Sequence, residues 1–240
     1  MYSLTTVTVK GCLMAITPIS GRVRPAQRLT LTDDVYESLK TLIMEHAIEP
    51  GERVSIDGLA RTLEVSPTPV REALARLESD GLVRKRAMSG YTTTPLLTRT
   101  EFDELFEMRL LLETAAARRA AGHADAEQRR RVREEAAATV AVEAGDGYRR
   151  HAAFTALDAR FHDLVAEVSG SGLLRESIIR LHSHLHLHRL YFPSAGTGDT
   201  VGEHKRIATA IAKGDADAAA TAMHQHLISA RDRHLPAFPA

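Results

Sequence analysis

The sequence predicts a mainly α-helical protein that consists of an N-terminal winged helix-turn-helix domain and an all-α bundle of about six helices. Two observations support this prediction. Residues 30–95 contain three short amphipathic segments followed by a β-favouring hairpin, which is the element order of a winged helix-turn-helix. Residues 96–240 show helical periodicity between glycine-containing breaks, and none of their segments favours a strand.

The composition limits the class of protein. With 31 Lys and Arg against 31 Asp and Glu, the 240-residue chain has no net charge, which argues against non-specific polyanion binding. Cys12 is the one cysteine, so an internal disulfide is excluded and a reducing compartment is favoured. No apolar run approaches the roughly 18–20 residues that span a bilayer. We expect a cytoplasmic protein without a membrane partner, and we expect residues 1–29 to be a disordered extension.

Three helices are predicted in the N-terminal domain. The first begins at Thr32 and ends near His46, before the break at Glu49-Pro50-Gly51. Ser55 caps a second helix over residues 55–63. Ser66 caps the third helix, with Pro67 at its first position, and the third helix buries an apolar stripe of Val70, Ala73, Leu74 and Leu77. Since very few residues join the second and third helices, they must cross steeply, as in a helix-turn-helix.

A basic hairpin follows the third helix. Its strands are predicted around Leu82 to Arg86 and around Tyr91 to Thr94, with a turn at Ser89-Gly90. In a winged helix-turn-helix the third helix enters the major groove of DNA, and residues near its N-terminus reach the base edges. Arg71 can bond two acceptors of guanine, which is worth about 1–3 kcal/mol of discrimination.

The predicted contacts with a double-stranded DNA operator combine base-reading and phosphate-binding groups. They are Arg61, Ser66, Thr68, Pro69, Arg71, Arg76, Arg84, Lys85, Arg86 and Gly90. The alternative is that Arg71 forms an ion pair with Glu72 or Glu78 on a solvated helix, and that the basic residues of the hairpin only improve solubility.

The run LARTLEVSPTPVREALARLESDGLV resembles the DNA-binding domain of the GntR family of bacterial transcription regulators. The matching positions are 59–60, 65–66, 68–74, 77 and 81–83. The family commonly has Arg where this chain has Pro67, so the resemblance implies that Thr68 and Arg71 take a larger share of base reading.

Six helices are predicted in the C-terminal domain after a linker at residues 95–98. Thr98 with Glu101 and Thr200 with Glu203 form capping boxes, and Asp215 is a further N-cap. The predicted helices cover residues 98–121, 125–144, 148–168, 172–190, 200–213 and 215–234.

Four potential metal ligands lie on faces of these helices that should be apolar. Asp158 and His162 are one turn apart, and two more helices contribute His204 and His226. A buried histidine alone is more often a hydrogen-bonded core residue than a ligand. One carboxylate and three imidazoles that converge within one bundle instead indicate a divalent metal site, for which zinc is the first candidate and nickel, manganese or iron are alternatives.

A second group of polar residues is predicted to bind an effector. Arg109 and Glu113 lie one turn apart on a buried stripe; either they form a self-satisfied pair, or part of the guanidinium remains free for a carboxylate ligand. On the predicted helix 172–190, His182, His186 and Arg189 lie beside the apolar stripe, and His184 points away. These histidines either line the effector cavity or form a solvated or interface array.

The C-terminal segment resembles the FCD ligand-binding domain of the FadR subfamily. The resemblance lies in RLLLE at 109–113, in Asp158-x-x-x-His162, in Glu203-His204 and in His226. It implies a divalent metal at the centre of the bundle, small organic acids as effectors, and the first-helix arginine as a carboxylate contact. Relatives often have Asn in the region where this chain has Ser169-Gly170-Ser171-Gly172.

The expected function is that of a homodimeric transcription regulator and repressor, not an enzyme. Two copies of the third helix would read a palindromic operator, and a small carboxylate effector bound beside the metal would control DNA binding. One alternative is a regulator that responds to metal without an organic effector. The other is a metal-dependent hydrolase or lyase, which is disfavoured because no further carboxylate is placed to act as a general base.

Overall fold

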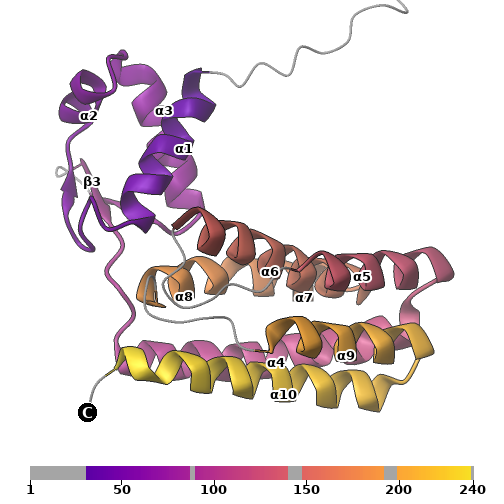
Figure 1. Ribbon diagram of the computed structural model, residues 1–240. Helices are drawn as coiled ribbons and strands as arrows, with labels where there is room; N and C mark the ends of the chain where they lie inside the picture. The colour runs from indigo at the N-terminus through magenta and orange to yellow at the C-terminus, as the bar shows by residue number, and fades with distance from the viewer. Residues whose placement is uncertain (1–30, 87–89, 140–147, 192–198, 239–240) are drawn as a thin grey trace, which may run out of the picture.

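The computed structural model describes residues 31–86, 90–139, 148–191 and 199–238. It contains two domains, an N-terminal one with a small sheet and a helical C-terminal one (Figure 1). The predicted fold class is therefore confirmed. The predicted disordered extension at residues 1–29 lies outside the described residues.

The N-terminal domain is a winged helix-turn-helix. Its elements are α1 (Leu31–Met44), β1 (Arg53–Val54), α2 (Ile56–Thr62), α3 (Pro67–Ser79), β2 (Val83–Arg86) and β3 (Gly90–Thr93). Ser55 caps α2 as predicted, because its hydroxyl accepts a hydrogen bond from the Gly58 backbone N–H at 3.1 Å. The buried faces of α1 and α3 meet in a core of aliphatic side chains that includes Leu39, Ile43, Val70, Leu74 and Leu77.

The sheet has one strand more than the sequence predicted. Its order is β1-β3-β2, with both pairs antiparallel, and the register places Arg53 opposite Thr92 and Arg86 opposite Gly90. The strand β1 has only two residues, which is too short to produce a periodic pattern in the sequence. It connects the segment between α1 and α2 to the wing.

The C-terminal domain consists of helices that lie in two layers, with α4, α9 and α10 in one and α5 to α8 in the other (Figure 1). The elements are α4 (Arg99–His123), α5 (Ala126–Ala138), α6 (Tyr148–Val168), α7 (Gly172–Arg180), α8 (Ser183–Tyr191), α9 (Thr200–Lys213), α10 (Ala216–His234) and a short 3₁₀ turn, η1 (Leu235–Ala237). The predicted capping box of Thr98 and Glu101 is present, and Asp215 caps α10 by accepting from the Ala218 N–H at 2.9 Å.

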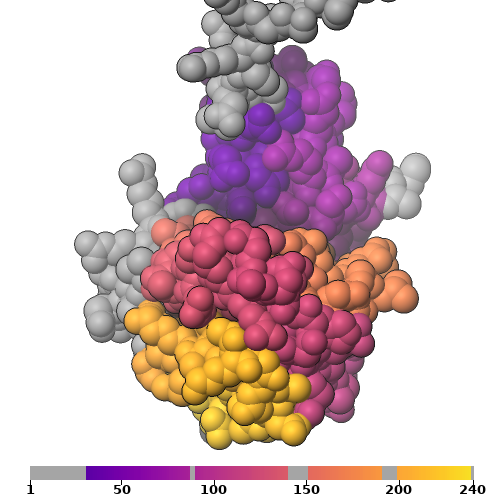
Figure 2. Space-filling model, turned by 90° about the vertical axis from the view of Figure 1, so that its right-hand side faces the viewer, coloured from indigo at the N-terminus to yellow at the C-terminus, as the bar shows by residue number. Residues whose placement is uncertain are grey.

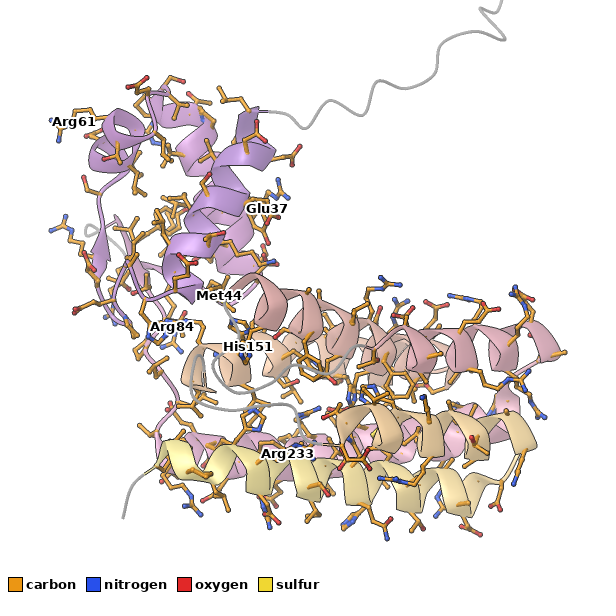
Figure 3. All side chains as sticks on the ribbon, in the orientation of Figure 1. Glu37, Met44, Arg61, Arg84, His151 and Arg233 are labelled. Carbon is orange, nitrogen blue, oxygen red and sulfur yellow. The ribbon has the colours of Figure 1, made fainter. Side chains whose placement is uncertain are left out.

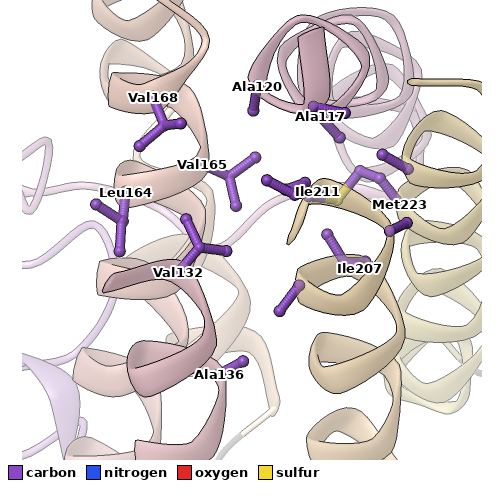
Figure 4. Close-up of a cluster of buried hydrophobic side chains, with 14 of the residues drawn as sticks. Ala117, Ala120, Val132, Ala136, Leu164, Val165, Val168, Ile207, Ile211 and Met223 are labelled. Carbon is purple, nitrogen blue, oxygen red and sulfur yellow. The ribbon is translucent and has the colours of Figure 1, made fainter. Parts of the chain in front are cut away.

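Small side chains allow the helices of the bundle to pack closely. Ala117 and Ala120 of α4 face Val165 of α6 and Ile211 of α9 in a fully buried cluster (Figure 4). The same cluster extends to Val132 of α5 and to Met223 and Leu227 of α10. This core fixes the positions of α4, α6, α9 and α10, the helices that carry the inward-facing polar residues.

Three predicted features of the bundle are wrong. The helix expected over 125–144 ends at Ala138, because the backbone of Thr139 is extended. The helix expected over 172–190 is interrupted between α7 and α8, where His182 has a φ of 47°. The capping box expected for Thr200 and Glu203 is absent, because Asp199 is the N-cap of α9 and makes no side-chain cap hydrogen bond. The Glu203 side chain instead bonds to residues of α10.

The two domains contact each other through α8. The imidazole of His182 lies against Gly81, and Leu185 packs against the core of the N-terminal domain. Arg189 is fully buried and donates from Nη2 to the Thr94 backbone oxygen at 2.6 Å. In the space-filling view the N-terminal domain rises from one side of the bundle (Figure 2). Among the described residues, no helix is long and apolar enough to cross a membrane.

Candidate metal centre and DNA-binding surface

The four predicted metal ligands converge inside the bundle. Asp158 and His162 come from α6, His204 from α9 and His226 from α10. One ligand atom from each of the four residues can be chosen so that all four atoms lie within 4.8 Å of one another, and the three histidines are buried.

The distances within this quartet suit a single ion. Nε2 of His162 lies 3.1 Å from Nε2 of His226, and Oδ1 of Asp158 lies 3.2 Å from Nε2 of His204. Ligand distances of about 2.0–2.2 Å to one zinc ion allow two ligand atoms to be at most about 4.4 Å apart, which these two distances satisfy, and the 4.8 Å bound on the whole quartet is only slightly larger. Apart from each other, Asp158 Oδ1 and His204 Nε2 have no hydrogen-bond partner among the described residues, and both atoms are buried. A cation between them would satisfy both atoms.

The protonation states also favour metal binding. Burial lowers the pKa of His226 to about 4 and lowers the pKa of His204 as well, so both imidazoles are neutral and keep a lone pair for a metal ion. Burial alone would raise the pKa of Asp158, but the facing imidazoles, His204 first among them, hold it well below its usual range. The site therefore offers an ionised carboxylate and neutral imidazoles near neutral pH.

A second layer of polar groups orients the three imidazoles. Nδ1 of His162 bonds to the Glu113 carboxylate, Nδ1 of His226 lies 2.7 Å from Glu203 Oε2, and Nδ1 of His204 lies 3.2 Å from Thr139 Oγ1. Bonds of this kind leave each Nε2 as the metal-binding nitrogen and hold each ring in place. No sequence pattern indicated the role of Thr139, which lies near the end of α5.

Arginine residues compensate both of the buried acids. Arg109 donates from Nε to Glu113 Oε1 at 2.7 Å, and Arg233 donates to both oxygens of Glu203 at 2.9 Å. Burial would raise the pKa of Glu113, but Arg109 and His162 hold it well below its usual range. Burial likewise opposes ionisation of Glu203, yet its bonds to His226 and Arg233 lower its pKa to about 2.

The pairing of Arg109 with Glu113 leaves part of the guanidinium unused. Arg109 is 2% exposed, and in the part of the chain that the structure describes only its Nε makes a hydrogen bond. The sequence left two alternatives open, a self-satisfied pair or a partly free guanidinium, and the structure has features of both. Glu113 is paired with Nε of Arg109, and the Nη groups have no hydrogen-bond acceptor among the described residues.

The break before α8 changes which histidine faces the quartet. Nε2 of His184 lies 3.4 Å from Asp158 Oδ2, so the prediction that His184 points away is wrong. The residue in the left-handed conformation, His182, interrupts the helix, so the side chains of α8 do not continue the face predicted for one helix over 172–190.

The other predicted effector contacts on α8 lie toward the N-terminal domain. His182 packs against Gly81, Arg189 binds the Thr94 carbonyl, and His186 interacts electrostatically with Arg189 itself. Helical spacing separates His186 from His184, which faces the quartet. Their role in effector binding stays a prediction.

On the N-terminal domain, α3 exposes its first turn as the DNA prediction requires. Thr68 and Arg71 are exposed, whereas Pro69 is buried in the domain core. Arg71 forms no ion pair with any described residue. Its two alternative partners are engaged elsewhere, because Glu72 accepts a hydrogen bond from Thr32 and Glu78 accepts one from the Lys85 backbone N–H.

The remaining predicted DNA contacts differ in their surroundings. Ser66 is the N-cap of α3 but makes no side-chain cap bond, which leaves its hydroxyl available. Arg76 donates to Asp33 at 2.6 Å and lies over the Tyr36 ring, and this pairing competes with its predicted phosphate contact.

Arg61 lies at the end of the domain far from the bundle and Arg84 at the end near it (Figure 3). Arg84, Lys85, Arg86 and Gly90 are exposed on the wing, whose residues 87–89 lie outside the described ranges.

Known proteins share both domains of this chain. Residues 31–92 match the family "Bacterial regulatory proteins, gntR family", and residues 104–229 match the FCD domain. The chain is 30% identical over 236 residues to the Uxu operon transcriptional regulator of Escherichia coli (strain K12), with 84% of this chain and 86% of that protein covered.

Two further comparisons agree with this assignment. The uncharacterized HTH-type transcriptional regulator YdhC of Bacillus subtilis (strain 168) is 28% identical over 197 residues, with 81% of this chain and 84% of that protein covered. The fold matches that of E. coli McbR/YncC with a TM-score of 0.62 at 20% identity, over 84% of this chain and 95% of that one. The chain thus belongs to the GntR family, as a DNA-binding transcriptional regulator with a C-terminal FCD domain and not as an enzyme.

Proposed function

We propose that this regulator is a homodimeric repressor whose operator binding is controlled by a small organic acid bound beside a divalent metal ion. Asp158, His162, His204 and His226 would hold the ion, with zinc as the first candidate and nickel, manganese or iron as alternatives. The protein would act in the cytoplasm, where bacterial DNA is located.

One observation carries the metal assignment. Asp158 Oδ1 and His204 Nε2 are buried 3.2 Å apart and, apart from each other, have no hydrogen-bond partner among the described residues, at the point on which the other two imidazoles converge. Unsatisfied polar atoms inside a core each cost about 1–3 kcal/mol, and a bound cation removes that cost. The positive charge of the ion would also attract an anionic ligand.

The protein residues have separate roles in this proposal. Glu113, Glu203 and Thr139 orient the imidazoles, and Arg233 keeps Glu203 ionised. Nε of Arg109 already donates to Glu113, so its Nη groups are the donors that best suit a carboxylate ligand.

Metal analysis and a thermal-shift screen test the proposal. The purified protein should contain about one divalent ion per chain. Small mono- and dicarboxylates should raise its melting temperature, and both a chelator and Arg109→Ala should abolish that stabilisation. Absence of metal binding would contradict the proposal. Metal-dependent DNA binding without any response to carboxylates would favour the metal-responsive alternative.

The homodimer and the palindromic operator are tested together. Two α3 helices related by a twofold axis would read two half-sites, so double-stranded DNA selected by the protein from a random pool should contain an inverted repeat. Sedimentation equilibrium should give twice the chain mass. A monomer that binds a single half-site would exclude this part of the proposal.

A further inference from the structure

Helix α8 brings a fifth ionisable side chain to the candidate metal centre. Nε2 of His184 lies 3.4 Å from Oδ2 of Asp158, and its ring centroid lies 4.9 Å from that of His162. The nitrogen atom is buried and has no hydrogen-bond partner among the described residues. It faces the second oxygen of Asp158, since Oδ1 is the oxygen that approaches His204 and His162.

A neutral imidazole at this position can donate only one hydrogen bond. It carries a single N–H, which serves one acceptor well at a time. A shift of a few tenths of an ångström brings Nε2 of His184 within ordinary bonding distance of Asp158 Oδ2. An anionic ligand beside the metal would offer a competing acceptor to the same N–H.

Three other side chains of this segment contact the DNA-binding domain, whereas Leu187 and His188 contact α4 and α6 of the bundle. His182 packs on Gly81, Leu185 joins the N-terminal core, and the guanidinium of Arg189 donates to the carbonyl of Thr94, which directly follows β3. Helix α8 is short and runs only from Ser183 to Tyr191, so a movement of its backbone at His184 also moves the side chains that make these contacts.

We propose that His184 is the ligand-sensing residue of this regulator: its Nε2–H bonds Asp158 Oδ2 when no organic ligand is bound and bonds a carboxylate ligand when one is, and the exchange moves α8 against the winged helix-turn-helix. This inference rests on the proposed function, since the ligand is the carboxylate beside the metal. The ligand changes DNA affinity only through its different affinity for the two positions of α8.

The test uses Co²⁺ as the metal and acetate as the smallest carboxylate probe. Full-length wild-type protein, His184→Leu and His184→Gln are compared with His224→Leu, a control at an exposed position of α10. Visible absorption reports Co²⁺ and acetate binding, and fluorescence anisotropy reports binding to DNA selected by the wild type. Chloride at equal ionic strength corrects for screening.

We expect all four proteins to bind Co²⁺. Acetate should weaken DNA binding by at least about fivefold in the wild type and in His224→Leu, the lower end of typical coupling between sites. In His184→Leu, acetate should still bind, but its effect on DNA affinity should fall below about twofold. His184→Gln, which keeps an N–H donor, should restore part of the effect, and a merely structural role would not produce this rescue.

Several outcomes would overturn the inference. A His184→Leu protein that keeps the full acetate effect would do so, as would a wild type that binds Co²⁺ and acetate without any change in DNA affinity; both leave the metal site intact. A wild type that binds no Co²⁺ would instead overturn the proposed function. Circular dichroism checks folding, and if His184→Leu does not fold, His184→Asn replaces it, because the asparagine amide is too short to reach Asp158.

Discussion

At the scale of single residues, the candidate site depends on pairs in which one member orients the other. The three imidazoles of the quartet each use Nδ1 for a bond to Glu113, Glu203 or Thr139, and this leaves Nε2 directed inward. The sequence pattern indicated the quartet itself, since helical spacing places Asp158 and His162 on one face. It did not indicate Thr139, because a lone threonine at the end of a helix has no distinguishing pattern.

Replacement of Glu203 by glutamine should weaken metal binding while the metal ligands stay in place. The substitution removes the charged acceptor of His226 Nδ1 and leaves the side chain's shape unchanged. Loss of such a partner typically lowers metal affinity about 10–100-fold, which competition with a chromophoric chelator would measure. Glu176→Gln, an exposed acid that pairs with Arg180, is the control and should have no effect.

Replacement of Arg71 by alanine should reduce specific DNA binding. The exposed guanidinium has no ion-pair partner among the described residues, so the loss is expected to be that of a base contact, about 1–3 kcal/mol. Binding to non-specific DNA should change much less in the same anisotropy assay. Arg118→Ala, which removes an exposed arginine of the bundle, is the matched control. Equal operator affinity of Arg71→Ala and wild type would exclude Arg71 as a base-reading residue.

At the scale of elements, the interruption between α7 and α8 was the principal error of prediction. The segment from Gly172 to Leu190 has a continuous apolar stripe and no internal Gly or Pro, which favours one helix. The left-handed conformation of His182 is unfavourable by about 1–2 kcal/mol for a residue with a Cβ, so packing against Gly81 has to stabilise it. The contact between His182 and Gly81 joins residues far apart in the sequence, so local sequence cannot predict it. His184 was consequently assigned to the wrong face.

A pair of glycine substitutions measures the contact between α8 and the N-terminal domain. Gly51 and Gly81 both have positive φ, at 81° and 73°, but a Cβ at Gly51 would meet no atom within 4 Å. A Cβ at Gly81 would lie 3.1 Å from Cδ2 of His182. We expect Gly51→Ala to lower the free energy of unfolding by about 1–2 kcal/mol and Gly81→Ala by about 1 kcal/mol more.

The excess cost at Gly81 should disappear when His182 is also replaced by alanine. Chemical denaturation of the single and double variants measures this coupling. If Gly81→Ala lowers the free energy of unfolding equally with His182 and with alanine at that position, the His182 imidazole does not contact Gly81 in solution.

At the scale of the whole molecule, the element order and the apolar periodicity were sufficient to predict both domains. Helix ends were predicted where local capping is strong, as at Ser55, Thr98 and Asp215. The bounds of α9 were also predicted correctly, but its capping box was not, because Glu203 bonds to His226 and Arg233 instead of capping the helix. The sequence thus predicted the architecture and the convergence of Asp158, His162, His204 and His226, whereas the second layer around this quartet depends on tertiary contacts.

Acid should destabilise the metal-free protein. Burial lowers the pKa of His234 to about 4, whereas in the unfolded chain histidine titrates near pH 6.5. Between these two values the unfolded state binds more protons, so stability rises with pH across this window and is lost as the pH falls. From pH 7 to pH 5 this histidine should account for a loss of about 2 kcal/mol in the free energy of unfolding.

Urea denaturation with chelator present measures this pH dependence. His234→Phe should lose less stability on acidification than the wild type. His123→Phe is a matched control, because each histidine places Nδ1 against the carbonyl four residues earlier, His123 at 2.8 Å and His234 at 2.7 Å, but His123 is exposed. Identical pH profiles for His234→Phe and wild type would show that His234 is not the group that titrates.

The two-residue strand β1 has a consequence for how a signal changes gene expression. By pairing with β3, it ties the segment before α2 to the wing, and the Glu52 carbonyl accepts a further hydrogen bond from the Thr93 N–H at 2.9 Å. We therefore expect the helix-turn-helix and the wing to move together. In the proposed homodimer, an effector would alter the distance and angle between two such domains without altering the bases that either one prefers, so inducing conditions should change the favoured spacing of half-sites and leave the half-site sequence the same.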